Sequence, residues 1–492
     1  MTDTLIVGAG TAGCLLAARL SEDPNHKVRL VEAGPAWSTA DEIPAELLRA
    51  DRMPVGPESP WLWRYPALLT ADDAGHGVST ELVRGRVLGG SGAINGGYFV
   101  RALAADFTAW CRELGGSAEW SLDAVLPAYR QIERDHDYGD DPGHGGSGPI
   151  PVRRIIDPTP VSVEFAAVAA AAGYPEIPDL NALPGPVITN GFGPVPCNVE
   201  RGLRIGTATA CLLPALARPN LTVSGGITVT RIRFDGTVAV GVDYRAGSAT
   251  GTIPADRIVV CAGAVESAAL LLRSGVGDPE HLRALDIPVV HPAPVGDWFC
   301  DHPEIGLGYR IGSAASGSGS VPLEYVLELD DIEIRPYALP FTPDTQARRL
   351  GVALMRPRSA GVLRLHCADP DIAPRLEYRY LSAAHDRERL SAAVSLAADL
   401  LHRIPGVRQP HRPPAGVGVA WLRANLATSQ HLSGTCRMGA AGDERAVVDE
   451  RCRVHGVSGL SVVDLSVVPV PLSRGPQATV MMIAEHVADH FT

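Results

Sequence analysis

Positive charge, aromatic side chains and long apolar runs are all scarce in this chain of 492 residues. Phe, Trp and Tyr together make up 5% of the sequence, and 43 Lys and Arg stand against 55 Asp and Glu, which gives a formal net charge of −12. A surface of that sign repels phosphate backbones, which argues against a nucleic-acid partner. No run approaches about eighteen uninterrupted apolar residues, and no basic segment with an apolar stretch behind it opens the chain. We therefore expect neither an integral membrane segment nor a secretory signal.

Paired cysteines are also missing. The nine cysteines are scattered, no two have CxxC spacing, and their number is odd. These features argue against a zinc site and against a full disulfide framework, so we expect no metal and reduced thiols in a cytoplasmic protein. The rest of the composition is that of an ordinary globular protein, with 46% hydrophobic and 20% charged residues. The length suggests two or three structural units.

The first residues follow the order strand, glycine turn, helix, strand and acid. Apolar runs at 4–7 and 28–31 flank a GxGxxG turn and a helix-like stretch at 14–20. Such a turn lets the backbone approach a pyrophosphate and lets the helix pack close to the sheet. The acid at the end of the second strand can accept hydrogen bonds from ribose hydroxyls. The order predicts a dinucleotide site without choosing between FAD and NAD. Its expected ligands are Gly8, Gly10, Thr11, Ala12, Gly13, Glu32 and Ala33.

Further stretches resemble the signatures of the glucose–methanol–choline (GMC) oxidoreductases. The first signature matches from Gly85 through Ala102 and misses only at its last position. The second is recognisable from Gly263 through Gly277, where Ala268 stands in place of the usual Pro or Ser. Asp301-His302-Pro303 and the C-terminal segment resemble the family as well, so the resemblance covers the whole chain.

The resemblance implies FAD as the cofactor. In some relatives a histidine just before the position of Asn95 bonds covalently to the flavin. Here that position holds Ile94, which has no nucleophile, so we expect FAD to bind non-covalently. The family holds adenine through backbone at the position of Val229 and places the Asp464 region by the flavin ribityl and pyrophosphate. The residues expected at the cofactor beyond the first loop are Arg86, Gly89, Gly90, Ser91, Asn95, Gly96, Gly97, Val229, Ala262, Gly263, Asp464, Leu465, Gln477, Ala478 and Thr479.

The resemblance also implies the fold class. It is an α/β fold in which a glucose-oxidase-like, Rossmann-type FAD-binding domain carries a second α+β substrate-binding domain built on an antiparallel sheet. The pattern from 306 to 410 is dominated by strands, and Ile332 to Tyr337 alternates as a half-exposed strand does. We expect the FAD-binding domain to be assembled from 1–150, 201–305 and 431–492, and the substrate-binding domain from 151–200 and 306–430.

The catalytic base is expected at His431. The stretch from His431 to Gly439 resembles the family's HxxGTxxMG motif. An imidazole titrating near neutrality suits removal of a hydroxyl proton as hydride leaves the alcohol carbon for flavin N5. Relatives place a second His or Asn eleven residues after the position of Asp464, but here that position holds Gly475. Either Arg474 or Gln477 helps to orient the substrate oxygen, or His431 works alone.

Two elements should frame this segment. An apolar run from Leu460 to Ser466 predicts a strand with Asp464 near its end. Pro476 suits the N-terminus of a final helix, predicted to run to about Asp489. The family places that helix end at the flavin pyrimidine edge, where its positive charge would stabilise the anionic reduced flavin.

The sequence thus predicts an FAD-dependent oxidoreductase acting on CH–OH groups. Among relatives it most resembles the dehydrogenases associated with mycofactocin, a peptide-derived redox carrier, through its short length and the segment from Arg474 to Thr479. That implies oxidation of mycofactocinol to mycofactocinone, with electrons passed to a respiratory-chain acceptor at the inner face of the cell membrane. Three alternatives stay open: a dehydrogenase or oxidase of a simple alcohol or choline-like substrate, a lyase with structural FAD, and a flavin-binding subunit without catalysis.

Overall fold

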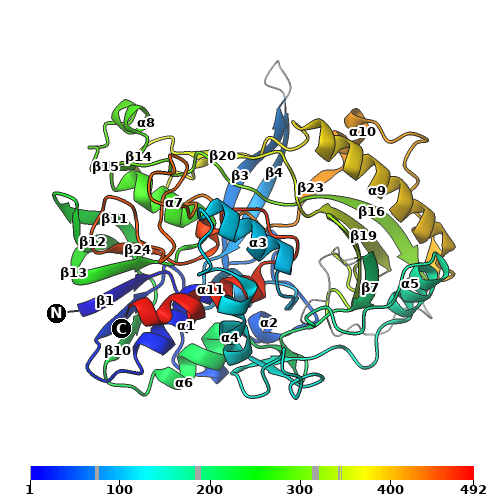
Figure 1. Ribbon diagram of the computed structural model, residues 1–492, viewed down its shortest axis with the longest axis horizontal. Helices are drawn as coiled ribbons and strands as arrows, with labels where there is room; N and C mark the ends of the chain where they lie inside the picture. The colour runs from blue at the N-terminus through cyan, green and yellow to red at the C-terminus, as the bar shows by residue number, and fades with distance from the viewer. Residues whose placement is uncertain are drawn as a thin grey trace.

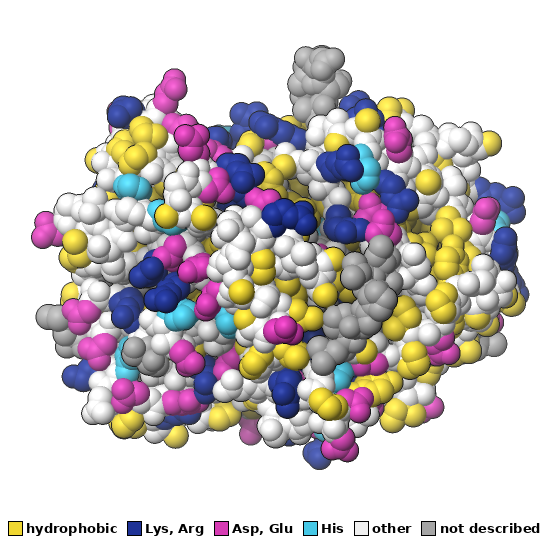
Figure 2. All heavy atoms as spheres, in the orientation of Figure 1, with side chains coloured by type: hydrophobic (Ala, Val, Ile, Leu, Met, Phe, Trp, Pro, Cys, Tyr) yellow, Lys and Arg dark blue, Asp and Glu magenta, His cyan; other side chains and the backbone are white. Residues whose placement is uncertain are grey.

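The computed structural model describes residues 2–71, 77–182, 190–312, 321–341, 344 and 346–491. Two large sheets lie side by side in Figure 1, with the hairpin of β3 (Leu62–Ala71) and β4 (Gly77–Gly85) between them. On the face shown in Figure 2, acidic and basic side chains are interspersed over most of the surface. Among the described residues, no helix combines the length and the apolar character that a membrane crossing requires.

The first sheet is parallel at its centre. Its strand order is β10 (Leu221–Ser224), β2 (Val28–Val31), β1 (Thr2–Val7), β13 (Ala249–Val260) and β24 (Leu460–Val462), and every neighbouring pair is parallel. Apolar runs form these strands because helices cover both faces of a parallel sheet, leaving few positions for polar side chains. The sheet therefore joins segments that are more than 400 residues apart in the sequence, as the expected fold requires.

Three helices cover this sheet. α1 (Thr11–Leu20) and α11 (Gln477–Val487) pack against each other on one face, and α7 (Gly263–Arg273) lies on the other (Figure 1). β12 (Val238–Ala246) and β11 (Thr228–Asp235) extend the sheet as an antiparallel flap from the long β13. The helices α1, α7 and α11 all begin at the same edge of the sheet, and this shared edge positions the site.

The second sheet is antiparallel throughout, as expected. It contains β7 (Asn190–Pro194), β16 (Pro303–Ile311), β17 (Tyr325–Leu329), β18 (Ile332–Pro336), β19 (Ala347–Leu354), β22 (Val407–Arg408) and β23 (Leu426–Thr428). α9 (Ala384–Arg403) packs on it next to α5 (Pro160–Ala171). The fold class is therefore confirmed, whereas the domain boundaries stay a proposal. Residues 1, 72–76, 183–189, 313–320, 342–343, 345 and 492 within those boundaries lie outside the described part.

One local prediction was incomplete and another is wrong. The segment from 306 to 410 contains the predicted strands, and it also contains α9, a helix of twenty residues that was not predicted. β18 is not half-exposed: all five of its residues are buried, Glu333 and Arg335 included. These two charged side chains can be buried because they pair with each other, Arg335 Nε donating to Glu333 Oε2 at 2.8 Å.

The predicted strand from Leu460 to Ser466 is shorter than expected. β24 ends at Val462, and a 3-10 turn covers Leu465–Val467. The turn begins here because the Asp464 carboxylate accepts the amide of Ser466 at 2.8 Å, which caps the turn and draws the chain out of the sheet.

Shorter elements complete the chain. They are α2 (Ala45–Leu48), α3 (Ala104–Glu113), α4 (Leu122–Ile132), α6 (Leu213–Ala215), α8 (Pro279–Ala284), α10 (Val419–Ala424), β5 (Glu133–Asp135), β6 (Ile150–Val152), β8 (Val199–Glu200), β9 (Leu203–Arg204), β14 (Val276–Gly277), β15 (His291–Pro292), β20 (Val362–Arg364) and β21 (Arg375–Glu377).

Candidate active site

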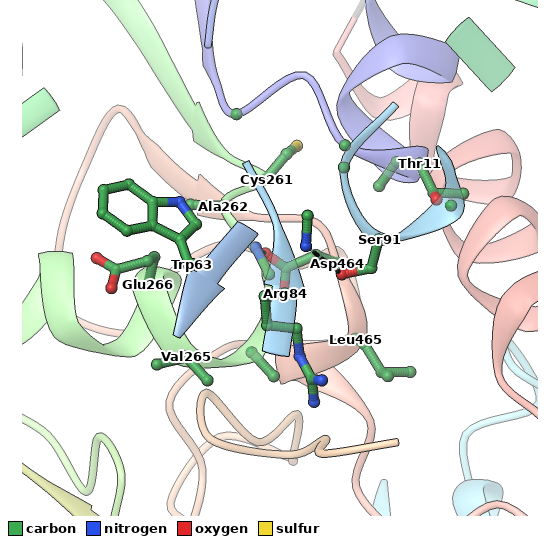
Figure 3. Close-up of a pocket in the computed structure, with 18 of the residues that line it drawn as sticks. Thr11, Trp63, Arg84, Ser91, Cys261, Ala262, Val265, Glu266, Asp464 and Leu465 are labelled. Atoms are coloured by element: carbon green, nitrogen blue, oxygen red, sulfur yellow. Dashed lines mark hydrogen bonds between the residues drawn. The ribbon is translucent and has the colours of Figure 1, made fainter. Parts of the chain in front are cut away.

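One continuous pocket starts at the carboxyl ends of β1 and β2 and reaches His431. In Figure 3, Thr11 and Ser91 lie on one side of it, and Trp63 and Glu266 lie on the opposite side. With its open mouth it contains about 1570 Å³ free of protein atoms, which suits a long ligand. The sequence-predicted residues that line it are Gly8, Gly10, Thr11, Ala12, Glu32, Ala33, Gly90, Ser91, Asn95, Gly96, Val229, Ala262, Gly263, His431, Asp464, Leu465 and Gln477.

Two helix N-termini open into this pocket. Neither α1 nor α11 has a side-chain cap, and in the described part of the chain no acceptor meets the amides of Thr11, Ala12, Gln477 or Ala478. Free amides at the positive end of a helix dipole are a binding site for anions. The Gln477 side chain links the two ends, because its Nε2 donates to Thr11 Oγ1 at 3.4 Å. The pocket can therefore hold a diphosphate at α1 and a second electron-rich group at α11.

The glycine turns fit this pocket so closely that larger residues are excluded. A Cβ on Gly13 would lie 2.0 Å from the carbonyl oxygen of Gly8, and one on Gly90 would lie 2.8 Å from Cα of Gly10. Because backbone atoms cannot move aside cheaply, each of these positions needs glycine. The loop after β4 is thereby held directly against the first turn, as a cradle for a ligand between them.

Glu32 stands at the end of β2, where a dinucleotide ribose is recognised. Its carboxylate accepts the amide of Ala9 at 2.9 Å and the amide of Gly34 at 2.8 Å. Burial raises the pKa of this carboxyl, while the two amides oppose the shift. The acid therefore also ties the glycine turn to the strand end.

Asp464 anchors a third part of the wall. Its Oδ2 accepts the amide of Gly263 at 2.8 Å and the hydroxyl of Ser267 at 2.5 Å. Through these bonds the turn after β24 is fixed to the first turn of α7. The residues named by the two GMC signatures and by the C-terminal segment thus meet in one place.

His431 lies beside a second histidine, His302. The two Nδ1 atoms are 2.9 Å apart, and His302 Nε2 is 2.9 Å from the carbonyl oxygen of Leu472. A carbonyl oxygen can only accept, so His302 Nε2 carries its proton, and a neutral His302 then accepts at Nδ1. His431 must donate from Nδ1, which leaves its Nε2 without a proton. His431 is thereby prepared as a proton acceptor.

The electrostatic surroundings keep both rings neutral. Burial lowers the pKa of His302 to about 3. Burial first, and then His302, Arg335 and Arg84, hold the pKa of His431 well below its ordinary value. Asp301 fixes the two backbones, because its Oδ1 accepts the amide of His302 at 2.7 Å and that of His431 at 2.8 Å. The pair is therefore rigid and uncharged.

Arg474 does not line the pocket. Its guanidinium is buried, pairs with Glu328 at 2.6 Å and donates to the carbonyl oxygen of Leu180 at 2.5 Å. This geometry does not support our expectation that Arg474 orients a substrate oxygen. The neighbouring Gly475 does line the pocket, and the ring of Tyr98 stands against it.

Other predicted residues lie just behind the pocket wall. Thr479 faces the core, where its hydroxyl is 3.0 Å from Tyr129 Oη, and the Arg86 guanidinium stacks on Trp63 at 4.5 Å. The predicted residues outside the lining are Gly13, Arg86, Gly89, Gly97, Arg474, Ala478 and Thr479. Sequence reasoning missed Trp63, Arg84, Tyr98 and Gln430 in the lining, and it did not pair His302 with His431. The Asp301-His302-Pro303 match was the one available signal for His302.

A second cluster of titratable groups lies away from the pocket, around His144. Glu133, Asp135 and His144 are buried, and their ligand-type atoms lie within 4.8 Å of one another. His144 Nδ1 contacts Glu133 at 3.1 Å and Asp135 at 3.3 Å. Arg101 and Arg154 add ion pairs to the two carboxylates at 2.5 and 2.6 Å. These pairs engage the carboxylates, so the cluster is an ion-pair network.

Comparisons with known proteins agree with this geometry. Two family models, both described as GMC oxidoreductase, match residues 2–304 and 357–484. An uncharacterized GMC-type oxidoreductase of Rhodococcus erythropolis is 44% identical, over 98% of this chain and 97% of its own length. An oxygen-dependent choline dehydrogenase of Escherichia coli is 34% identical, over 99% and 95%. The crystal structure of pyridoxine 4-oxidase from Mesorbium loti superposes with a TM-score of 0.90 at 28% identity, over 100% and 99%.

The chain belongs to the GMC oxidoreductase family. It is an FAD-dependent oxidoreductase acting on CH–OH groups, as members of this family are. The geometry of the pocket also fits FAD independently of the comparisons. Free helix amides and closely packed glycine turns suit the diphosphate of FAD, and an acid at a strand end suits its ribose.

Proposed function

We propose that the protein oxidises an alcohol carbon with His431 as the base and His302 as the residue that sets its tautomer. One observation carries the proposal: His302 receives the Nδ1 proton of His431, which leaves His431 Nε2 free in the wall of the pocket. A base of this kind contributes about 10²–10⁴-fold to a proton transfer. When bound, FAD would supply the two-electron acceptor for the hydride of the alcohol carbon.

The protein residues supply binding, orientation and proton transfer. The turn from Gly8 to Gly13 and the amides that begin α1 would hold the diphosphate, and Glu32 would hold the ribose. His431 Nε2 accepts the hydroxyl proton while the C–H bond breaks, so the alcohol leaves as a carbonyl compound. Ile94 is buried against apolar neighbours and offers no nucleophile, which supports non-covalent FAD.

Reduced mycofactocin is our proposed substrate. Support comes from the segment Arg474-Gly475-Pro476-Gln477-Ala478-Thr479, in which Gly475 has no side chain where the resemblance to the family implies a His or Asn. The product would be mycofactocinone, and the two electrons would pass to a respiratory-chain acceptor, with the enzyme in the cytoplasm and peripheral to the inner face of the cell membrane. A simple alcohol or a choline-like substrate is the second candidate, favoured by the choline-oxidising relative.

Anaerobic reduction of the flavin tests the proposal and separates the two candidates. We would mix the holoenzyme with mycofactocinol, choline, benzyl alcohol and ethanol in turn, without oxygen, and follow loss of flavin absorbance. Bleaching by mycofactocinol with a carbonyl product is expected. Bleaching by choline or a simple alcohol, with none by mycofactocinol, would reject the substrate and keep the reaction class. A lyase with structural FAD would leave the flavin oxidised while converting its substrate.

A further inference from the structure

The ring of Tyr98 occupies the space that a side chain at position 475 would need. A Cβ on Gly475 would lie 2.7 Å from Cδ1 and 3.0 Å from Cε1 of Tyr98. Both residues line the pocket that contains His431. A larger residue at 475 and the present position of the Tyr98 ring are therefore mutually exclusive.

Backbone strain does not explain the glycine at 475. Gly475 is absent from the residues with positive φ, so an L-residue could adopt its conformation. The backbone cannot retreat easily either, because the adjacent Arg474 is fixed by its ion pair with Glu328 and its bond to the carbonyl of Leu180. The contact with Tyr98 is thus what requires glycine here.

Tyr98 is held in place by a buried charged network. Its hydroxyl donates to Glu333 Oε1 at 3.3 Å, and Glu333 pairs with Arg335 at 2.6 Å. Arg335 in turn donates to Ser429 Oγ at 2.9 Å, and the amide of Ser429 donates to the carbonyl oxygen of His302 at 3.0 Å. A continuous series of bonds therefore connects the Tyr98 ring with the histidine that orients His431.

We propose that Tyr98 takes over the place of the missing second side chain and acts as a positioning and specificity residue for the alcohol. Its ring forms part of the wall of the pocket that contains His431, and the network through Glu333 holds that part of the wall in place relative to the base. This inference rests on the proposed function, because it concerns how the alcohol is held for His431. A substrate displaced by about 1 Å can lose about 10²-fold in rate.

A side-chain exchange tests the proposal. Gly475→Asn should clash with the ring, Tyr98→Ala should leave the alcohol without its wall, and Tyr98→Ala with Gly475→Asn should restore a filled pocket. For each holoenzyme we would measure the rate of anaerobic flavin reduction and the apparent Kd, with mycofactocinol, benzyl alcohol and 2-naphthalenemethanol. We expect each single variant to lose about 10²-fold in the rate of reduction over Kd and the double variant to recover at least part of it.

Specificity gives a readout that a purely structural role would not move. Tyr98→Ala should raise the efficiency with 2-naphthalenemethanol relative to benzyl alcohol, because the pocket widens. Tyr325→Ala is the matched control, because Tyr325 lies on β17 beside the strand of Glu333 but outside the pocket lining, and it should not change the efficiency ratio of the two alcohols. If none of the three alcohols reduces the flavin, we would compare melting temperatures instead. The clash predicts that Gly475→Asn lowers the melting temperature and that adding Tyr98→Ala restores part of it.

Strictly additive effects of the two substitutions, or wild-type rate, Kd and alcohol ratio in Tyr98→Ala, would overturn the proposal. Failure of the proposed function looks different. In that case His431→Ala would reduce its flavin as fast as the wild type, whatever happens at position 98.

Discussion

His302 accepts a hydrogen bond from His431 through two Nδ1 atoms that lie 2.9 Å apart, and the carbonyl oxygen of Leu472 sets the direction of that bond. The carbonyl fixes a proton on His302 Nε2, so the proton between the two rings belongs to His431. A positioning residue thereby determines which nitrogen of the base is available. The residues are 129 positions apart, and they meet because β16 begins directly after His302 and pairs with β23, which ends three residues before His431.

Replacing His302 should slow flavin reduction without releasing the cofactor. In His302→Ala the Nδ1 proton of His431 loses its acceptor, so the ring is free to adopt the other tautomer or to rotate. We expect the rate of anaerobic reduction to fall by at least about 10-fold, as happens when a base loses the partner that orients it. FAD content, measured by absorbance after gel filtration, should stay at the wild-type level. An unchanged rate in this variant would show that the tautomer is set elsewhere.

The pH dependence of reduction should reflect a base that stays neutral in acid. The pKa of His431 lies well below its ordinary value, so the imidazole keeps its free Nε2 as pH falls through 6.5. We predict a rate of flavin reduction that is flat between about pH 8 and pH 6. A rate that halves near pH 6.5 would mean that His431 titrates as an exposed histidine does.

The two lowered pKa values also predict how the stability of the folded protein depends on pH. The folded pKa values of His302 and His431 are lowered, so below about pH 6.5 the unfolded chain binds more protons than the folded one. The contribution of these two histidines to stability is therefore lost as pH falls. The melting temperature of the wild type should decline below pH 6.5 more than that of His302→Ala, which lacks one of the two groups.

The His144 network should respond in the opposite direction. Its bonds to Asp135, Asp179 and Glu133 outweigh burial and raise the pKa of His144 to about 10. Its stabilisation is fully present below the unfolded pKa of about 6.5 and is lost as pH rises to about 10. His144→Gln should cost about 3–5 kcal/mol in the free energy of unfolding near pH 6, the range for breaking a buried ion pair. In denaturant titrations, this difference from the wild type should shrink toward pH 10; a constant difference would contradict the assigned charge.

Cofactor binding should depend on the absence of a side chain at Gly13. Gly13→Ala places a Cβ 2.0 Å from the carbonyl oxygen of Gly8, which must push α1 away from the glycine turn. We expect the purified variant to contain little FAD and to take up little on reconstitution. Gly56→Ala is the matched control, because a Cβ there meets nothing within 4 Å and the backbone is not in the left-handed region. Equal FAD content in the two variants would show that the turn from Gly8 to Gly13 does not bind the cofactor.

Local patterns predicted residues at the nucleotide end of the site that the structure brings together in one pocket. The turn from Gly8 to Gly13 and the acid at 32 were readable because strand, turn, helix and strand follow one another within a single unit. α9 was missed although Leu390, Val394, Ala397 and Leu401 repeat at helical spacing and are all buried. The segment was described only by the strand patterns that precede this helix.

The alcohol end could not be read in the same way. His302 and Tyr98 acquire their roles from partners at 431 and 475, which the sequence separates from them by more than 100 residues. The alternation in β18 suggested a half-exposed strand because a buried ion pair and an exposed one look alike in a sequence. Only the structure shows that the charged side chains of β18 are buried, because they bond to Tyr98 and to Glu304 of β16.

The central claim is that a free Nε2 on His431 accepts the alcohol proton. Anaerobic stopped-flow reduction of His431→Ala, with FAD content and melting temperature matched to the wild type, tests it most directly. We predict a loss of about 10²–10⁴-fold in the rate of flavin bleaching with the best alcohol substrate. A variant that bleaches at the wild-type rate would contradict the claim.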